Sequence, residues 1–112
     1  MRISEAHRYL KELLKLKDFG KSPNEIGDYL IFSGSNQSSI GSDELSFKVF
    51  IQQRSFNYDS SGVIARLDEI REILFKESIN KPNDLNFDID FKGFEDSLFV
   101  YEINIVLKVC RK

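Results

Sequence analysis

The stretch that decides the fold is residues 45–53, which read LSFKVFIQQ. Apolar side chains occupy every second position from Leu45 to Ile51, and most of the positions between them are polar. Successive side chains of a β-strand point to opposite faces, so a period of two predicts a strand with one buried face. That buried face needs a second layer of structure to cover it, which the rest of the sequence must supply.

Three more segments have the pattern of strands. Residues 29–32 form a brief apolar run, YLIF, and we expect this run to pair with residues 45–53 as a hairpin. Residues 85–91 alternate apolar side chains with Asn and Asp, which predicts a strand with one face in water. Residues 98–110 are long enough for an extended strand that packs on both of its faces.

Two segments instead have the three- and four-residue spacing of an amphipathic helix. The first begins at Ile3, and we expect about four turns that end near Asp18–Gly20, because Gly20 can take the left-handed conformation common after helices. The second follows candidate N-caps at residues 59–61. Its apolar stripe is Val63, Ile64, Leu67, Ile70, Ile73 and Leu74.

These elements follow the order α-β-β-α-β-β and predict an α+β fold. We expect one four-stranded mixed sheet with two helices packed mainly on one face. A chain of 112 residues is the size of one domain, so residues 1–112 are expected to form a single domain. Residues 33–44 are rich in Gly, Ser and Asn and predict a flexible loop inside the first hairpin.

Composition narrows the class of protein. Hydrophobic residues make up 41% and charged residues 30%, with a formal net charge of −2, which is ordinary for a globular domain. Proteins that bind nucleic acid usually carry a basic face, so this balance argues against nucleic acid. The N-terminus lacks the apolar run of a signal peptide and no segment has the length of a membrane span, so we expect a cytoplasmic protein without a membrane partner.

The sequence offers little for catalysis. His7 is the single histidine and Cys110 the single cysteine, so neither has a second residue of its kind with which to share a metal. We interpret both as structural residues and expect no catalytic residues, no metal and no cofactor. The chain also lacks a glycine motif that would cradle phosphate.

One pattern of oxygen ligands invites a calcium interpretation. Acids and an amide recur at alternate positions from Asp84 to Asp90, and Glu95 follows, which resembles the spacing of a calcium loop. The glycine that such a loop requires is replaced by Ile89, and the neighbouring apolar residues favour a strand. A solvated acidic strand face is the preferred interpretation.

The residues around 47–74 resemble a known family. A strand that runs through FKVFIQQ to Arg54, a short turn with Tyr58, and a helix with Ala65, Leu67, Ile70 and Leu74 resemble the minor capsid and tail terminator proteins of long-tailed bacteriophages. In that family an arginine typically ends the strand and an aromatic residue precedes the helix. The amphipathic N-terminal helix and the C-terminal strands agree with the family's order of elements.

The resemblance implies a structural virion-assembly protein of a phage or prophage. Such a subunit forms a homo-oligomeric ring, often hexameric, that caps the tail tube and joins it to the head connector. It implies assembly in the bacterial cytoplasm and a final place in the virion tail. It also implies that Arg54 and Tyr58 lie at subunit contacts, and that Asn36, Gln37 and Ile40 contact the tube or the connector.

Other functions remain open on the sequence alone. Helix-and-sheet domains of this size include small regulatory and nucleic-acid-binding modules, which is the main alternative. A metal-dependent enzyme that uses the acidic strand 84–90 is a second alternative. A head-completion protein with a similar fold is a third.

Overall fold

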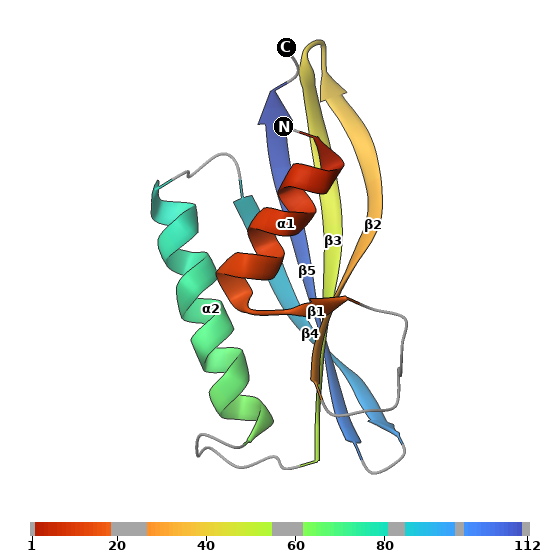
Figure 1. The fold of residues 1–112 in the computed structure, drawn as a ribbon, viewed down its shortest axis with the longest axis vertical. Helices are drawn as coiled ribbons and strands as arrows, with labels where there is room; N and C mark the ends of the chain where they lie inside the picture. The colour runs from red at the N-terminus through yellow and green to blue at the C-terminus, as the bar shows by residue number, and fades with distance from the viewer. Residues whose placement is uncertain (1, 19–26, 55–61, 81–84, 96–97, 111–112) are drawn as a thin grey trace.

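The computed structural model describes residues 2–18, 27–54, 62–80, 85–95 and 98–110 of the chain (Figure 1). All later statements about structure concern these ranges. The helices are α1, Ile3–Leu14, and α2, Val63–Asn80. The strands are β1, Lys17–Asp18; β2, Gly27–Ser39; β3, Ser42–Gln53; β4, Leu85–Glu95; and β5, Leu98–Cys110.

The strands form a sheet in the order β1-β2-β3-β5-β4. Each of the four long strands is antiparallel to its long neighbours, so the predicted mixed sheet is wrong for these four. The parallel pairing that the sheet does contain joins the two residues of β1 to β2. The α+β class and the two hairpins joined by α2 are confirmed. The chain forms antiparallel hairpins, and β5 then inserts between β3 and β4, which the order of elements alone does not predict.

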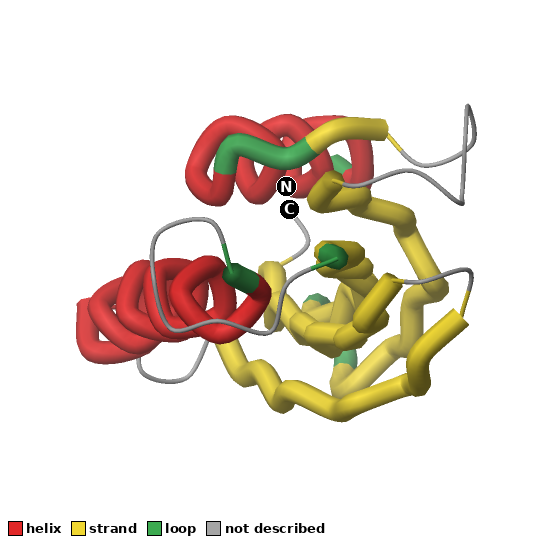
Figure 2. The backbone as a smooth tube through the Cα atoms, turned by 90° about the horizontal axis from the view of Figure 1, so that it is seen from below, coloured by secondary structure: helices red, strands yellow, loops and turns green. Residues whose placement is uncertain are grey.

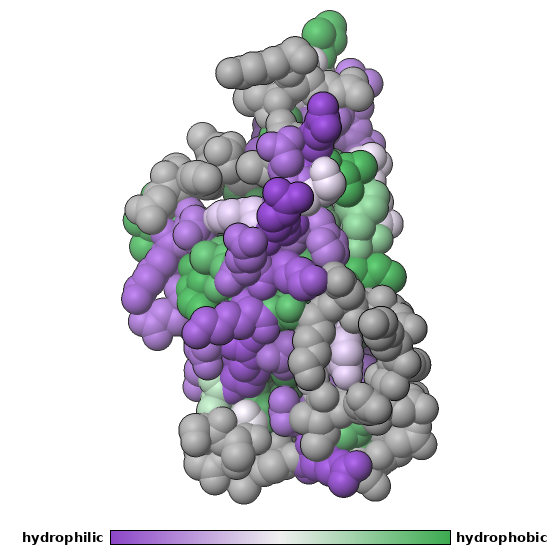
Figure 3. Space-filling view, viewed as in Figure 1, coloured by the Kyte–Doolittle hydropathy of each residue, from purple (hydrophilic) through white to green (hydrophobic). Residues whose placement is uncertain are grey.

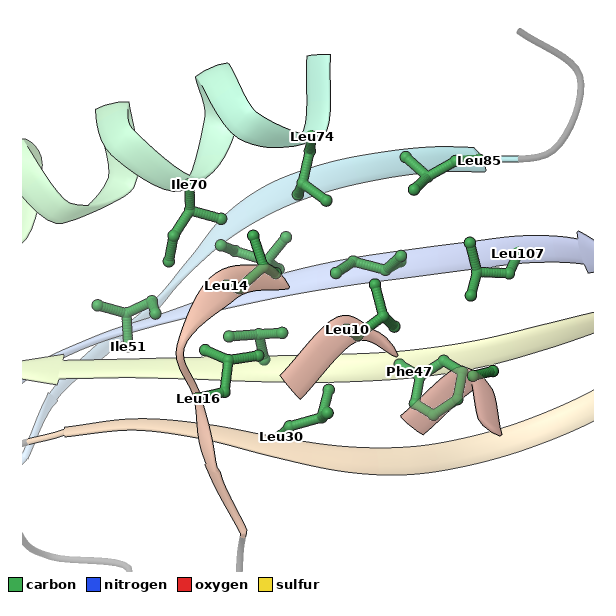
Figure 4. Packing of buried hydrophobic residues seen from close by; sticks show 14 of the residues in the cluster. Leu10, Leu14, Leu16, Leu30, Phe47, Ile51, Ile70, Leu74, Leu85 and Leu107 are labelled. Atoms are coloured by element: carbon green, nitrogen blue, oxygen red, sulfur yellow. The ribbon is translucent and has the colours of Figure 1, made fainter. Parts of the chain in front are cut away.

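Both helices cover the same face of the sheet, as predicted. Viewed along the strands, α1 and α2 lie side by side against a strongly twisted sheet (Figure 2). Figure 4 shows apolar side chains from both helices pointing at side chains from the sheet. The fully buried members with the largest side chains are Phe47, Leu10, Leu14, Leu30, Ile51, Ile70, Leu74, Ile103 and Ile105. Alternate residues of β3 and β5 therefore face the helices, and the residues between them form the opposite face, here called the open face.

The predicted loop at residues 33–44 is wrong, because these residues belong mostly to the β2–β3 hairpin. Pairing continues from Gly34 opposite Ser46 to Ser39 opposite Ser42, with a register shift next to each of the first and last pairs. The hairpin closes at Ile40 and at Gly41, whose φ of +83° is left-handed. Ser and Gly lower the apolar content of a strand but leave its backbone donors and acceptors in place. Residues 33–39 therefore pair with β3, whose alternating pattern sets the register, although their own composition does not indicate a strand.

Helix α1 ends earlier than predicted. Its last residue is Leu14, and Lys15 adopts the left-handed conformation with φ 55° and ψ 56°, the role that we expected of Gly20. Leu16 then returns to the core with 6% exposure, and β1 begins at Lys17. Ending α1 here lets Leu16 face the sheet, so core packing decides where the helix stops.

Two polar contacts hold the helices in place. The Arg66 guanidinium of α2 donates to the Asp28 carboxylate of β2 at 2.5 Å and to the carbonyl oxygen of Leu14 at the end of α1. The hydroxyl of Tyr9 on α1 donates to the Glu77 carboxylate on α2 at 2.8 Å. One contact thus lies near the first turn of α2 and the other near its last, so α2 is fixed at both ends.

The hydroxyl of Tyr9 is expected to lose its proton at a higher pH than an ordinary tyrosine. Burial, together with the hydrogen bond to the Glu77 carboxylate, raises its pKa from 10.0 to about 12. Because the folded pKa exceeds the unfolded one, the stabilisation from this group is complete below pH 10 and is lost as the pH rises towards 12. The difference between the phenolate absorbance titrations of the wild type and Tyr9→Phe should show a midpoint near pH 12. A midpoint near pH 10 would show that the contact does not form.

Candidate assembly surface

The tip of the β2–β3 hairpin is the most exposed apolar point in the described chain. Ile40 is 99% exposed, and Asn36 and Gln37 on strand β2 are also exposed. Figure 3 shows hydrophobic surface at this tip and again along the β2 side of the molecule. The three residues predicted to contact a tube or connector therefore lie on one projecting hairpin. Asn36 and Gln37 belong to its strand β2, and Ile40 belongs to its turn.

Arg54 lies at the opposite end of the molecule. It follows the last residue of β3 and is exposed, whereas Ile40 precedes the first residue of β3. A strand of the length of β3 spans about 40 Å, so these two candidate contacts do not form a single site. Tyr58 lies outside the described residues. A ring subunit can use opposite ends for different partners, which is compatible with the separate roles predicted for Arg54 and Ile40.

Two long strands, β4 and β2, lie towards the two edges of the sheet. Strand β4 pairs with β5 on one side, and the described residues place no strand on its other side. Strand β2 pairs with β1 only at Tyr29 and Leu30, so its outer edge from Ile31 to Ser39 has no strand partner within the described ranges.

Edge strand β4 also carries exposed aromatic rings. Phe91 and Phe94 are 56% and 58% exposed. Their ring centroids lie 5.1 Å from that of Tyr101 and 4.8 Å from that of Phe99 on β5. Each ring therefore packs on a neighbouring ring with one side and meets solvent with the other, so this part of β4 presents apolar surface.

The open face contains a buried carboxylate that sequence reasoning missed. Glu102 on the central strand β5 has a side chain only 5% exposed. Its two carboxylate oxygens lie 2.9 Å from Lys48 Nζ of β3 and 3.0 Å from Lys92 Nζ of β4. The acid thus bridges the strands on both sides of it. The only signal in the sequence is an acid among apolar residues of β5, because the two lysines are brought to it by strand register.

The charge state of Glu102 should matter for stability. Hydrogen bonding to Lys48, the largest cause, and to Lys92 lowers the pKa of this carboxyl, against the opposing effect of burial, and Glu102 in turn raises the pKa of Lys92. A lowered folded pKa means that the stabilisation is present above the unfolded pKa, about 4.3, and is lost as the pH falls through the folded value.

Glu102→Gln should therefore destabilise the fold at neutral pH and matter little in acid. We expect a loss of about 2 kcal/mol at pH 7, typical of hydrogen bonds to charged groups, and almost none near pH 2. Urea unfolding of both proteins between pH 7 and pH 2 measures this difference. A difference that stays constant with pH would show that the amide disrupts packing rather than charge pairing.

The other residues considered for chemistry do not converge. No group of three His, Cys, Asp or Glu side chains that could hold a metal occurs in the described part of the chain. Asp88 is exposed on the open face and accepts a hydrogen bond from Asn104 Nδ2 at 2.8 Å. His7 is half-buried on α1, with its ring centroid 6.3 Å from that of Phe47. The His7 ring therefore lies near the Phe47 ring, at the border of the core.

Comparison with known proteins gives no assignment. No protein-family model matches the sequence, and no curated protein matches it either. Among the described residues, no helix has both the length and the apolar character needed to cross a membrane.

Proposed function

We propose that this chain is a structural assembly subunit of the tail terminator type, encoded by a phage or prophage. It would form a ring that caps the tail tube and contacts the head connector. The observation that carries the proposal is the exposed position of Ile40 at the tip of the long, paired β2–β3 hairpin. The resemblance of residues 47–74 to tail terminator proteins is the reason for proposing this type of assembly.

The position of Ile40 conflicts with local preference. Turn positions favour Gly, Asn, Asp and Ser, and a β-branched side chain there contributes neither turn geometry nor, at 99% exposure, core packing. A residue that breaks a local rule without a structural gain points to function. Contact with an apolar partner surface is the gain that suits an isoleucine, because such contact removes its side chain from water.

The open face gives no support to the nucleic-acid alternative. Lys48 and Lys92 are the basic residues near its centre, and both are paired with Glu102. Glu102 offsets one of these two positive charges, and Asp90 and Asp88 add negative charge near Lys92. Salt-sensitive binding of a DNA or RNA oligonucleotide by the purified protein would favour that alternative over assembly.

The test is the solution mass of the full chain, measured by light scattering on a size-exclusion column over a wide range of concentrations. We expect a closed species of several subunits that gains population as the concentration rises, and rings by electron microscopy. A strict monomer over the whole range would contradict the proposed ring.

Arg54→Ala tests the predicted subunit contact. Because Arg54 is exposed in the monomer, its truncation should change the free energy of unfolding by less than about 0.5 kcal/mol. If it lies at the subunit contact, the concentration needed for assembly should rise at least tenfold, as for an interface residue worth about 1.4 kcal/mol. The matched control is Arg8→Ala, because Arg8 is exposed on α1, and this variant should leave assembly unchanged. Equal behaviour of the two variants would remove Arg54 from the interface.

A further inference from the structure

Strand β4 is divided by a β-bulge near its end. Pairing with β5 runs from Leu85 to Phe91, shifts register, and resumes with Gly93 opposite Val100. Lys92 is the extra residue at this shift, so the ladder is interrupted there. Gly93 has a φ of +139°, which favours glycine, and a Cβ at this position would meet no atom within 4 Å. Backbone conformation, rather than close packing, therefore requires a glycine at the bulge.

The two parts of β4 differ in how much apolar surface they bury. Before the bulge, Leu85 is buried and Phe87 packs against the core. After it, the side chain of Lys92 is half-exposed and most of the ring of Phe94 meets solvent. Segments with few buried apolar contacts open at a lower free-energy cost than the core. The second part, residues 92–95, is here called the strap, and we expect it to open before the rest of β4.

The strap is held on both faces of the sheet. On the open face, Lys92 Nζ lies 3.0 Å from a carboxylate oxygen of the buried Glu102. On the helix side, the ring of Phe94 lies with its centroid 4.8 Å from that of Phe99. Opening the strap would leave the Glu102 carboxylate with Lys48 as its remaining ion-pair partner in a site that is largely dry. The charge of Glu102 therefore favours the closed strap.

We infer that the strap opens when Glu102 loses its negative charge, while the rest of the sheet stays paired. Opening would uncover the ring of Phe99 and the carboxyl group of Glu102. The strap would then act as an acid-sensitive cover over the end of the β4–β5 hairpin. The inference stands apart from the proposed assembly function, because it concerns a movement within one chain.

The charged groups around Glu102 all change the balance in the same direction in acid. Lys48 of β3 and Lys92 of β4 contact its carboxylate, and Asp90 and Asp88 of β4 add negative charge near Lys92. Protonation of the three acids weakens the attractions that hold Lys92. The two lysines keep their charges, so their mutual repulsion remains.

The closed strap is expected at neutral pH. Hydrogen bonding to Lys48, the largest cause, and to Lys92 lowers the pKa of Glu102, against the opposing effect of burial. The contribution of the charged form is therefore complete above about pH 4.3, the value for an unfolded chain, and is lost as the pH falls through the lower folded value. Opening should accordingly begin below about pH 4.

Amide hydrogen exchange, followed residue by residue by NMR, tests the strap. Lys92→Met removes the ion pair from the strap, and Lys48→Met is the matched control, because it removes the equivalent ion pair from β3. At pH 6, we expect ladder amides of residues 93–95 to exchange about fivefold faster in Lys92→Met, as for a half-exposed ion pair. Residues 85–91 should be unchanged in this variant, and the strap should be unchanged in Lys48→Met.

The wild type gives the acid arm of the same experiment. After correction for intrinsic exchange, lowering the pH from 6 to 3 should open the strap at pH values where α2 and β3 remain protected. In Lys92→Met the strap should already be open more often at pH 6, and its opening should depend little on pH.

The other outcomes each overturn the inference. Equal acceleration in residues 85–91 and in the strap would mean that β4 opens as one unit. Equal effects of Lys92→Met and Lys48→Met on the strap would mean that the ion pairs stabilise the sheet as a whole. A strap that keeps its protection in the wild type until α2 and β3 unfold would show that the charge of Glu102 does not control it.

Discussion

Replacement of Phe47 by Ala is expected to lower the free energy of unfolding by about 4 kcal/mol, the middle of the usual range for a buried Phe. Phe47 is 1% exposed, lies at the centre of β3 and packs between the hairpin and α1. Its ring centroid is 5.3 Å from that of Phe32 on β2. The cavity left by Ala would separate α1 from two strands at once, so neighbouring side chains cannot easily fill it.

Urea unfolding followed by circular dichroism measures this loss. A small domain typically has about 5–15 kcal/mol in total, so the variant should be close to the limit of folding at 37 °C. Phe50→Ala is the matched control, because Phe50 lies on the same strand but is half-buried on the open face. We expect it to cost less than half as much. Equal losses would mean that the helix side of β3 is not the centre of the core.

The second large effect is expected from Arg66→Ala, which should cost about 3 kcal/mol. The Arg66 and Asp28 side chains are 15% and 16% exposed. Removing the guanidinium would leave the Asp28 carboxylate in a largely dry site without its partner. Among the described residues, the Oδ1 atom of Asp28 already has no hydrogen-bond partner in the wild type. The carbonyl oxygen of Leu14 would lose its donor as well.

Thermal unfolding separates this effect from that of an ordinary surface ion pair. Lys76→Ala removes a bridge to Glu72 whose two side chains are both 73% exposed, and it should cost less than about 0.5 kcal/mol. Combining Arg66→Ala with Asp28→Ala should recover part of the loss, because the buried charge is then gone. If Arg66→Ala matched Lys76→Ala, the contact would be no more than a surface bridge.

The sequence predicts well those elements whose own apolar residues follow the spacing of a helix or a strand. The apolar spacing from Ile3 to Leu14 and from Val63 to Leu74 locates both helices, and the alternation of residues 45–53 locates β3. The strand at 33–39 was missed because its side chains are small and polar, and its pairing is imposed by β3. Composition reports on side chains, whereas strand pairing is a property of two backbones.

The candidate site could be predicted only in part, for the same reason. The family resemblance named Asn36, Gln37 and Ile40 as contact residues of a predicted loop, whereas the structure has them on one hairpin. The bridge from Glu102 to Lys48 and Lys92 joins three strands that are far apart in the chain, and the order β3-β5-β4 creates it. No local pattern encodes that order, so neither the bridge nor the positions of β2 and β4 towards the edges of the sheet could be predicted from the sequence.

The insertion of β5 between β3 and β4 has a consequence for biosynthesis. β5 is the last of the five strands to leave the ribosome, and neither β3 nor β4 can complete its ladder before then. Contacts between residues distant in sequence form slowly, and strands that wait for a partner are exposed to aggregation. A released chain truncated after residue 97 should therefore remain sensitive to protease over residues 85–95, and protection of that segment would mean that β4 folds without its partner. During synthesis, β3 and β4 would therefore each lack the partner strand that β5 later provides. A chaperone could bind the chain in this state.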